Sequence, residues 1–206
     1  MARGRLITIE GLDGAGKTTA AATLVAALEE RGVDVRLLRE PGGVELSERI
    51  RALVKDPALT VGPRAEALLY AAARAQLVEE AVGPLLDAGT WVVLDRFVDS
   101  SLAYQGEGRG LGVDEIREIN EFGTGGLTPD RTLLLDIDPE TGQLRLDDRG
   151  GELDRLEREG REFFTKIGDA YRRLAAREPE RFRVVDARAG VDEVAADVVE
   201  AVADLI

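Results

Sequence analysis

The reactive side chains of this chain are carboxylates, hydroxyls, arginines and lysines, because its 206 residues include no cysteine and no histidine. The missing cysteines exclude disulfides, thiolate zinc sites and iron–sulfur clusters. The missing histidines remove the commonest general base and the commonest transition-metal ligand. Any chemistry must therefore run on the remaining polar groups, on backbone amides and on a hard cation.

The strongest chemical signal lies in residues 11–18, which read GLDGAGKT and match the phosphate-loop pattern G-x-x-x-x-G-K-[ST]. The glycines let successive backbone N–H groups point at phosphate oxygens, and the helix that follows adds the positive end of its dipole. In this pattern Lys17 reaches the β- and γ-phosphates, and the hydroxyl of Thr18 is a magnesium ligand. The motif follows a predicted strand and opens a predicted helix, so we interpret it as a nucleoside triphosphate site.

Two further groups of residues could complete such a site. Asp95 and Arg96 follow a buried strand, where the carboxylate can hold magnesium directly or through water and the guanidinium can hold a phosphate. Tyr70 and Arg74 stand four residues apart on one helix face, and an aromatic ring beside a forked donor suits a planar base. The alternatives are a capping aspartate with an exposed arginine, and a core tyrosine beside a surface arginine.

These residues must be positioned by alternating strands and helices. Strands are predicted at residues 5–10, 34–39, 90–94, 131–137 and 182–185. Helices are predicted at residues 19–31, 45–55, 64–87, 113–122, 157–177 and 191–206, with a kink at Gly83-Pro84 and a further helical stretch opening at residues 100–104. Residues 140–155 are polar and broken by glycine. The alternation predicts one α/β domain over residues 1–206, with a five-stranded parallel sheet, helices on both faces and ligands at the carboxyl ends of the strands.

The motifs in their order and spacing resemble the thymidylate kinase family over nearly the whole chain. The matching segments are EGLDGAGKTT at 10–19, REPGG at 39–43, LLYAAARAQ at 68–76, DRFVDSSLAYQG at 95–106 and DRLE at 154–157. The resemblance implies a P-loop NTPase fold, ATP-dependent phosphorylation of dTMP to dTDP for dTTP synthesis, Mg²⁺, a cytoplasmic location and a homodimer. It also implies that residues 140–155 form a mobile lid over ATP.

The same resemblance implies a role for each matched position. Tyr70 would stack on thymine, Arg74 and Gln105 would bond its edge, and Ser101 would lie beside it. Tyr104 would lie under the sugar and crowd a 2′-hydroxyl, while Asp13 would meet the 3′-hydroxyl. Arg51 and Arg96 would grip the dTMP phosphate, with Glu40 nearby. Asp95 would join Thr18 at the metal. The ATP site would comprise Gly11, Leu12, Asp13, Gly14, Ala15, Gly16, Lys17, Thr18 and, near adenine, Arg188.

Several positions depart from the family pattern. Tyr70 stands where a phenylalanine is usual, and Ala73 replaces an aspartate, so Arg74 is expected to lack its local anchor. Gly14 marks the subfamily in which the catalytic arginine comes from the lid. The candidates there are Arg145, Arg149 and Arg155. We predict Arg149 for the transition state and Arg155 for the contact between lid and ATP; in the alternative, Arg149 only balances the neighbouring aspartates.

Charge narrows the possible partners. The formal net charge of −13 disfavours nucleic acid and anionic membranes. We expect a cytoplasmic protein, because no apolar run reaches the length of a membrane span and the first residues do not resemble a signal peptide. Three other readings stay open: a small kinase for another monophosphate or a nucleoside, an ATP-binding regulatory module without catalysis, and, less favoured by the charge, a nucleic-acid-binding ATPase. A GTPase is disfavoured, because the nearest match to a guanine motif, at residues 165–169, has one residue too many.

Overall fold

The computed structural model describes residues 2–150 and 152–206. Its centre is a five-stranded sheet in the order β2-β3-β1-β4-β5, and every pair of neighbours is parallel. The strands are β1 (Leu6–Gly11), β2 (Val35–Arg39), β3 (Trp91–Asp95), β4 (Arg131–Asp136) and β5 (Phe182–Asp186). The predicted five-stranded parallel sheet is confirmed, and each predicted strand overlaps an observed one.

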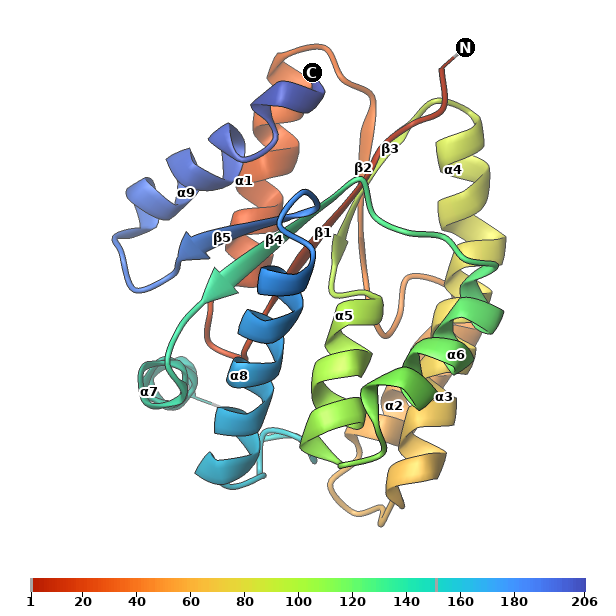
Figure 1. Ribbon diagram of the computed structural model, residues 1–206, viewed down its shortest axis with the longest axis vertical. Coiled ribbons are helices and arrows are strands. Elements are labelled where there is room, and N and C mark those ends of the chain that lie inside the picture. Colours follow the sequence, from red (N-terminus) through yellow and green to blue (C-terminus); the bar gives the residue numbers. More distant parts are fainter. Residues whose placement is uncertain (1, 151) are drawn as a thin grey trace.

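Helices cover both faces of the sheet (Figure 1). On one face α1 (Lys17–Glu30) packs against α9 (Val191–Glu200) and against the strands. The other face carries α4, α5 and α8, with α2, α3 and α6 beyond them. Their bounds are α2 (Glu45–Lys55), α3 (Pro63–Leu77), α4 (Gly83–Asp87), α5 (Val98–Ser101), α6 (Val113–Thr124) and α8 (Arg161–Arg177).

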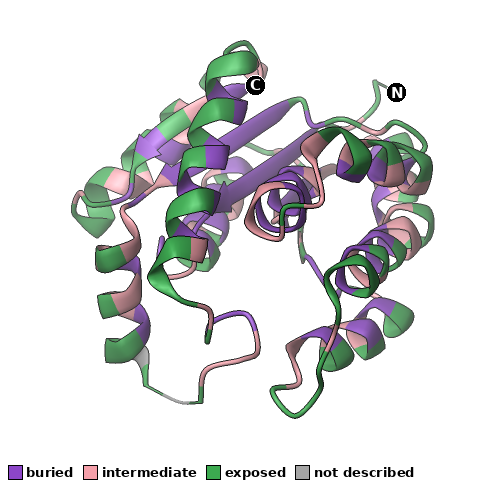
Figure 2. Cartoon of the chain, turned by 60° about the horizontal axis from the view of Figure 1, so that its bottom comes forward, coloured by how far each residue is buried: buried purple, intermediate pink, exposed green. Residues whose placement is uncertain are grey.

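Burial explains why these segments form this fold. Every residue of β1 is buried, as are the first five residues of β4, because these two central strands are covered by helices on both sides. Figure 2 shows the same pattern, with buried positions along the strands and on the inward sides of the helices. The central place of β1 puts the phosphate loop in the middle of the carboxyl edge, and Ile9 pairs there with Asp95 of β3.

Three helix predictions need correction. The predicted helix over 64–87 is interrupted by the π segment η1 (Val78–Val82), rather than only kinked at Gly83-Pro84. The amide of Gly83 bonds the carbonyl of Val78, five residues back, and Pro84 has no N–H to offer. The helix predicted from residue 157 begins at Arg161, after turns over residues 155–158, and the last helix ends at Glu200 before the 3₁₀ turn η3 (Ala203–Leu205).

The lid segment also differs from the prediction, because most of it is helical. Helix α7 (Pro139–Arg149) is preceded by Asp138, whose carboxylate accepts from the amide of Thr141 at 2.9 Å and so caps the first turn. Pro139 fits the first helical position because its missing N–H would have no partner there. Among the described helices, none combines the length and apolarity needed to cross a bilayer.

Candidate active site

A cavity of about 470 Å³ opens at the carboxyl edge of the sheet. It is bordered by the phosphate loop, the end of β3, α2, α3, α5 and α7, and by the π segment η2 (Leu102–Gly108). The predicted site residues on its wall are Asp13, Gly14, Gly16, Lys17, Thr18, Glu40, Arg51, Tyr70, Asp95, Arg96, Ser101, Tyr104, Gln105 and Arg145. Residues predicted from distant parts of the sequence thus share one cavity.

The phosphate loop has the backbone shape that its glycines predict. Gly14 and Gly16 have φ angles of 81° and 89°, in a backbone region that residues other than glycine rarely occupy. The ammonium of Lys17 is buried and donates to the carbonyl oxygens of Gly11 and Leu12, at 3.1 and 2.8 Å. Burial and the nearby charge of Arg96 lower the pKa of Lys17 to about 8. An anion in the loop would raise the pKa of Lys17 again.

A pair of oxygen ligands lies at the start of α1. The hydroxyl of Thr18 donates to Oδ2 of Asp95 at 3.0 Å, so the two predicted metal ligands are adjacent. Hydroxyl and carboxylate oxygens suit a hard cation such as Mg²⁺. The described residues contain no group of three acidic, histidine or cysteine side chains arranged to hold a metal. A metal here would therefore take most of its ligands from phosphate and water.

Arg96 is the most densely bonded charge on the cavity wall. Its Nη2 donates to Oδ1 of Asp13 at 2.7 Å and to the hydroxyl of Tyr104 at 3.2 Å, and the guanidinium lies 5.1 Å from the Tyr104 ring centre. The Tyr104 hydroxyl in turn donates to Oδ2 of Asp13. Burial alone would raise the pKa of Asp13, but the charges of Arg96 and Lys17 hold it below its ordinary value.

The predicted base-binding residues occupy the part of the cavity wall formed by α3, α5 and η2, which is called the base wall below. Tyr70 is half-buried and Ser101 is buried; both line the cavity. Arg74 lies behind them, only 2% exposed. Its Nε donates to Oε2 of Glu40 at 2.7 Å and its Nη1 to Oγ of Ser101 at 2.9 Å. It also bonds Oδ1 of Asn120 and the carbonyl of Phe97.

The expectation that Ala73 would leave Arg74 without an anchor is therefore wrong. The anchors come from other elements, chiefly Glu40 after β2 and Asn120 on α6. The second carboxylate oxygen of Glu40, Oε1, is buried and has no hydrogen-bond partner among the described residues. Burial raises the pKa of Glu40.

Gln105 is held by a buried carboxylate that the sequence did not single out. Its Nε2 donates to Oε1 of Glu66 at 3.0 Å, and Glu66 is fully buried on α3. Glu66 also accepts from Arg109 at 3.1 Å and from Arg155 at 2.7 Å. Although burial alone would raise the pKa of Glu66, hydrogen bonds from Arg109 and Gln105 hold it below its ordinary value. Glu66 therefore ties the base wall to the segment that follows α7.

The lid candidates lie in different places. Arg145 lines the cavity, and its Nη1 lies 3.5 Å from the carbonyl oxygen of Gly14. Arg155 instead donates to Glu66 and to the carbonyl of Val54, so its guanidinium is held at the α2–α3 wall. The side chain of Arg149 and the whole of Gly151 lie outside the part of the chain that the structure describes.

Arg188 lies away from the cavity in this structure. It follows β5, is exposed, and pairs with Asp186 through Nη2 and Oδ2 at 2.6 Å. Gly11, Leu12 and Ala15 are buried and do not line the cavity.

Two buried carboxylates next to the cavity wall, Glu10 and Glu66, have many partners and are not among the predicted site residues. Glu10 is the one charged residue of an apolar strand, and this is itself a signal, since a buried charge needs partners. Glu66 lies in the first turn of α3, where an acidic residue is normally explained by the helix dipole. Only the fold reveals its contacts with residues as far along as Arg155.

Comparison with known proteins agrees with this geometry. A family model described as "Thymidylate kinase" matches residues 9–198. A thymidylate kinase of Halorhodospira halophila is 48% identical over 206 residues, covering 99% of this chain and 96% of that protein. One from Geobacillus sp. is also 48% identical over 206 residues, covering 99% and 98%. One from Deinococcus radiodurans is 48% identical over 204 residues, with the same coverage of 99% and 98%. With such similarity over almost its full length, the chain belongs to the thymidylate kinase family.

Proposed function

We propose that the cavity at the carboxyl edge of the sheet carries out the reaction of this family, the ATP-dependent phosphorylation of dTMP to dTDP. The observation that supports this site most directly is that one cavity joins a phosphate loop to a wall bearing Tyr70, Ser101 and Gln105. Phosphoryl transfer needs alignment and charge neutralisation more than covalent chemistry, so a chain without histidine can perform it.

The donor phosphates would lie in the phosphate loop. The backbone amides of residues 11–18 and the ammonium of Lys17 would face the β- and γ-phosphates, and Arg188 would approach the adenine. Arg145 is our choice for the arginine that meets the transferred phosphoryl group, in place of Arg149 or Arg155. It is supported by its place on the cavity wall beside Gly14.

Thr18 and Asp95 would hold Mg²⁺, for which their adjacent oxygens are suited. When bound there, Mg²⁺ neutralises charge on the phosphoryl group during transfer. The chain's own part is to keep Thr18 at the first turn of α1 and Asp95 at the end of β3, so that both oxygens face the phosphate loop.

The acceptor would lie with thymine against Tyr70 and its edge toward Arg74, Ser101 and Gln105. Arg74 would act on the base mainly through the side chains that it positions, because its own donors are occupied by Glu40, Ser101, Asn120 and Phe97. Tyr104 and Asp13 would face the sugar. Arg51 and Arg96 would bind the phosphate, with Glu40 beside them.

We further propose a single catalytic domain over 1–206 that works as a cytoplasmic homodimer. Two exposed apolar side chains support a self-association face on the neighbouring helices α3 and α6. Leu68 on α3 is 57% exposed and Phe122 on α6 is 92% exposed. Light scattering on the native chain and on Phe122→Glu tests this: a native monomer would contradict the dimer.

A substrate panel tests the activity. The purified chain is given ATP and Mg²⁺ with dTMP, dUMP, UMP, dCMP, dAMP or thymidine, and ADP release is followed in a coupled assay. We expect dTMP to give the highest kcat/KM, and Lys17→Ala to abolish turnover with every acceptor. Binding of ATP and dTMP without turnover would instead indicate a regulatory module. A preference for another monophosphate or for thymidine would overturn the assigned acceptor.

A further inference from the structure

Glu10 is a carboxylate with no access to solvent at the end of the central strand. It is 0% exposed. Its Oε1 accepts from the backbone amides of Phe97 and Ser100, at 2.7 and 3.3 Å. Its Oε2 accepts from the hydroxyls of Ser100 and Tyr171, at 2.6 and 2.9 Å. Four donors from two other segments thus converge on one side chain.

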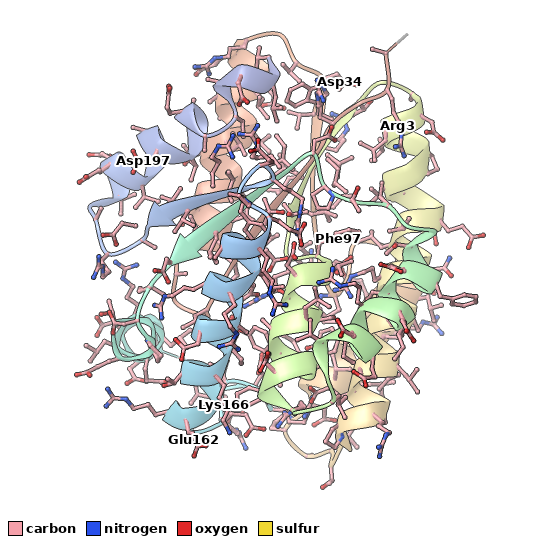
Figure 3. The ribbon with its side chains drawn as sticks, in the orientation of Figure 1. Arg3, Asp34, Phe97, Glu162, Lys166 and Asp197 are labelled. Carbon is pink, nitrogen blue, oxygen red and sulfur yellow. The ribbon has the colours of Figure 1, made fainter. Side chains whose placement is uncertain are left out.

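The donors that converge on Glu10 surround Arg96. Phe97 directly follows Arg96 in the sequence, so its amide belongs to the peptide that joins the two residues. It lies at the start of α5, just beyond the strand ends (Figure 3). The two hydroxyls also accept hydrogen bonds from the guanidinium of Arg96: its Nη1 is 3.0 Å from Oγ of Ser100 and 3.4 Å from the Tyr171 hydroxyl oxygen.

The backbone of Arg96 needs such support. Its φ is 74°, and it is the one described residue other than glycine with a positive φ. A non-glycine residue in this region is strained and keeps its conformation only where the surroundings enforce it. The bond from Phe97 to Glu10 fixes the peptide on one side of Arg96, and the amide of Arg96 bonds the carbonyl of Ile9 on the other.

We propose that Glu10 is a positioning residue, which holds Arg96 in the conformation that binds the phosphate of the acceptor nucleotide; this rests on the proposed role of Arg96. A carboxylate only accepts hydrogen bonds. When Glu10 is ionised, the hydroxyls of Ser100 and Tyr171, which lie 2.9 Å from each other, can both give their hydrogens to Oε2, which leaves their lone pairs for Nη1 of Arg96. An amide in place of the carboxylate would set an N–H against the backbone amides at Oε1, which loosens the peptide after Arg96, or against the hydroxyls at Oε2, which turns a hydroxyl hydrogen toward the guanidinium.

Asp99 offers a matched control, because it is a second buried carboxylate one residue from Ser100. It is 2% exposed, and its two oxygens bind Nη1 and Nη2 of Arg181 at 2.7 and 3.0 Å. It has no contact with Arg96 among the hydrogen bonds of the described residues. Asp99→Asn removes a buried charge that acts on Glu10 from a distance, but it leaves the hydrogen bonds of Glu10 and Arg96 in place.

The test compares the binding of dTMP with that of thymidine, which lacks the phosphate. Isothermal titration calorimetry is run on the native chain, Glu10→Gln, Asp99→Asn and Tyr171→Phe. We expect Glu10→Gln to weaken dTMP binding on the order of tenfold, the size of one lost charge-assisted contact, and to leave thymidine binding unchanged. Tyr171→Phe should shift dTMP binding in the same direction by less, and Asp99→Asn should lower the melting temperature but keep the preference for dTMP.

Equal weakening of both ligands in Glu10→Gln, or native binding of dTMP, would overturn the positioning role. If Glu10→Gln does not fold, Tyr171→Phe decides the matter by the same ratio. Arg96→Ala separates this inference from the proposed function. If Arg96→Ala keeps the preference for dTMP over thymidine, the assignment of Arg96 to the phosphate fails; if it loses the preference while Glu10→Gln keeps it, only the role of Glu10 fails.

Discussion

Arg145 of α7 lies beside Gly14 of the phosphate loop on the cavity wall, with Nη1 of the arginine 3.5 Å from the glycine carbonyl oxygen. The backbones approach closely as well. A Cβ placed on Gly14 would lie 2.2 Å from the carbonyl oxygen of Gly142 in α7, too close for any side chain. With α7 in this position residue 14 cannot carry an arginine, and the arginine next to the loop here is Arg145 of α7.

Replacement of this arginine tests that arrangement. Arg145→Ala should lower kcat by about 10²–10³, the usual loss when one preorganised donor to a transition state is removed, with little change in dTMP binding. Steady-state kinetics on alanine variants at 145, 149 and 155 check it, and Arg145→Lys asks whether a point charge is enough. Normal turnover in Arg145→Ala, with collapse in another variant, would move the role to that other arginine.

Lys17→Ala should remove turnover while leaving the fold intact. The ammonium is buried among loop carbonyls rather than in the apolar core. Its loss removes a positive charge that would stabilise the transferred phosphoryl group. We expect kcat to fall by several orders of magnitude, with the circular dichroism spectrum unchanged. Lys55→Ala is the matched control, because Lys55 also lines the cavity but pairs with Asp154 at 2.6 Å. Near-native turnover in folded Lys17→Ala would refute the phosphate-loop assignment.

Arg74→Ala should raise the KM for dTMP much more than that for ATP. Loss of the guanidinium releases Ser101 and Glu40 at the base wall, at a cost on the order of 1.5–3 kcal/mol. The variant should also lose about 3–5 kcal/mol of unfolding free energy, because Glu40 is left buried without its partner. Combining it with Glu40→Gln should recover stability but not the KM. Equal effects on the KM values of both substrates would place Arg74 outside base selection.

Tyr104 should govern sugar selection. Its ring is almost fully buried beside Arg96, and its hydroxyl bonds Asp13. Tyr104→Ala should narrow the preference for dUMP over UMP, by about tenfold or more if the ring excludes the 2′-hydroxyl by bulk. Tyr104→Phe keeps the ring and should keep the preference. An unchanged ratio of kcat/KM values in the alanine variant would assign the discrimination to other residues.

Glu10 should leave a signature in the pH dependence of stability. Burial, and then the charge of Asp99, raise its pKa from 4.5 to about 7. A carboxyl whose pKa is raised by folding contributes stability below about pH 4.5, and this contribution is lost as the pH rises through 7. Relative to Glu10→Gln, the native chain should lose about 3 kcal/mol of unfolding free energy between pH 4.5 and 8. Urea denaturation of both proteins measures it, and parallel pH profiles would contradict the shifted pKa.

Sequence alone predicted the parts of the site that depend on local pattern. Residues 11–18 are an example, because their glycine positions dictate the backbone angles that the structure shows. The α7 helix was missed because its polar sequence has no apolar period, although Asp138 and Pro139 form a recognisable start.

Contacts between distant segments could not be predicted. Glu10 meets Tyr171 across 161 positions and Glu66 meets Arg155 across 89, and no spacing rule reaches so far. The anchoring of Arg74 by Asn120 shows the same limit. An altered neighbour in sequence, Ala73, says little about a side chain whose partners come from three other elements.

The π geometry of η2 (Leu102–Gly108) makes the base wall sensitive to chain length. A π turn accommodates one residue more than an α turn, so this segment behaves as an α-helix that carries an insertion. Removing one residue would restore α geometry, but it would rotate Arg109 about the helix axis relative to Ser101. The side chain of Arg109 would then turn away from Glu66, which it now contacts. Point substitutions leave that rotation unchanged. Among relatives we therefore expect residue identities along this segment to vary more freely than the number of residues between Ser101 and Arg109.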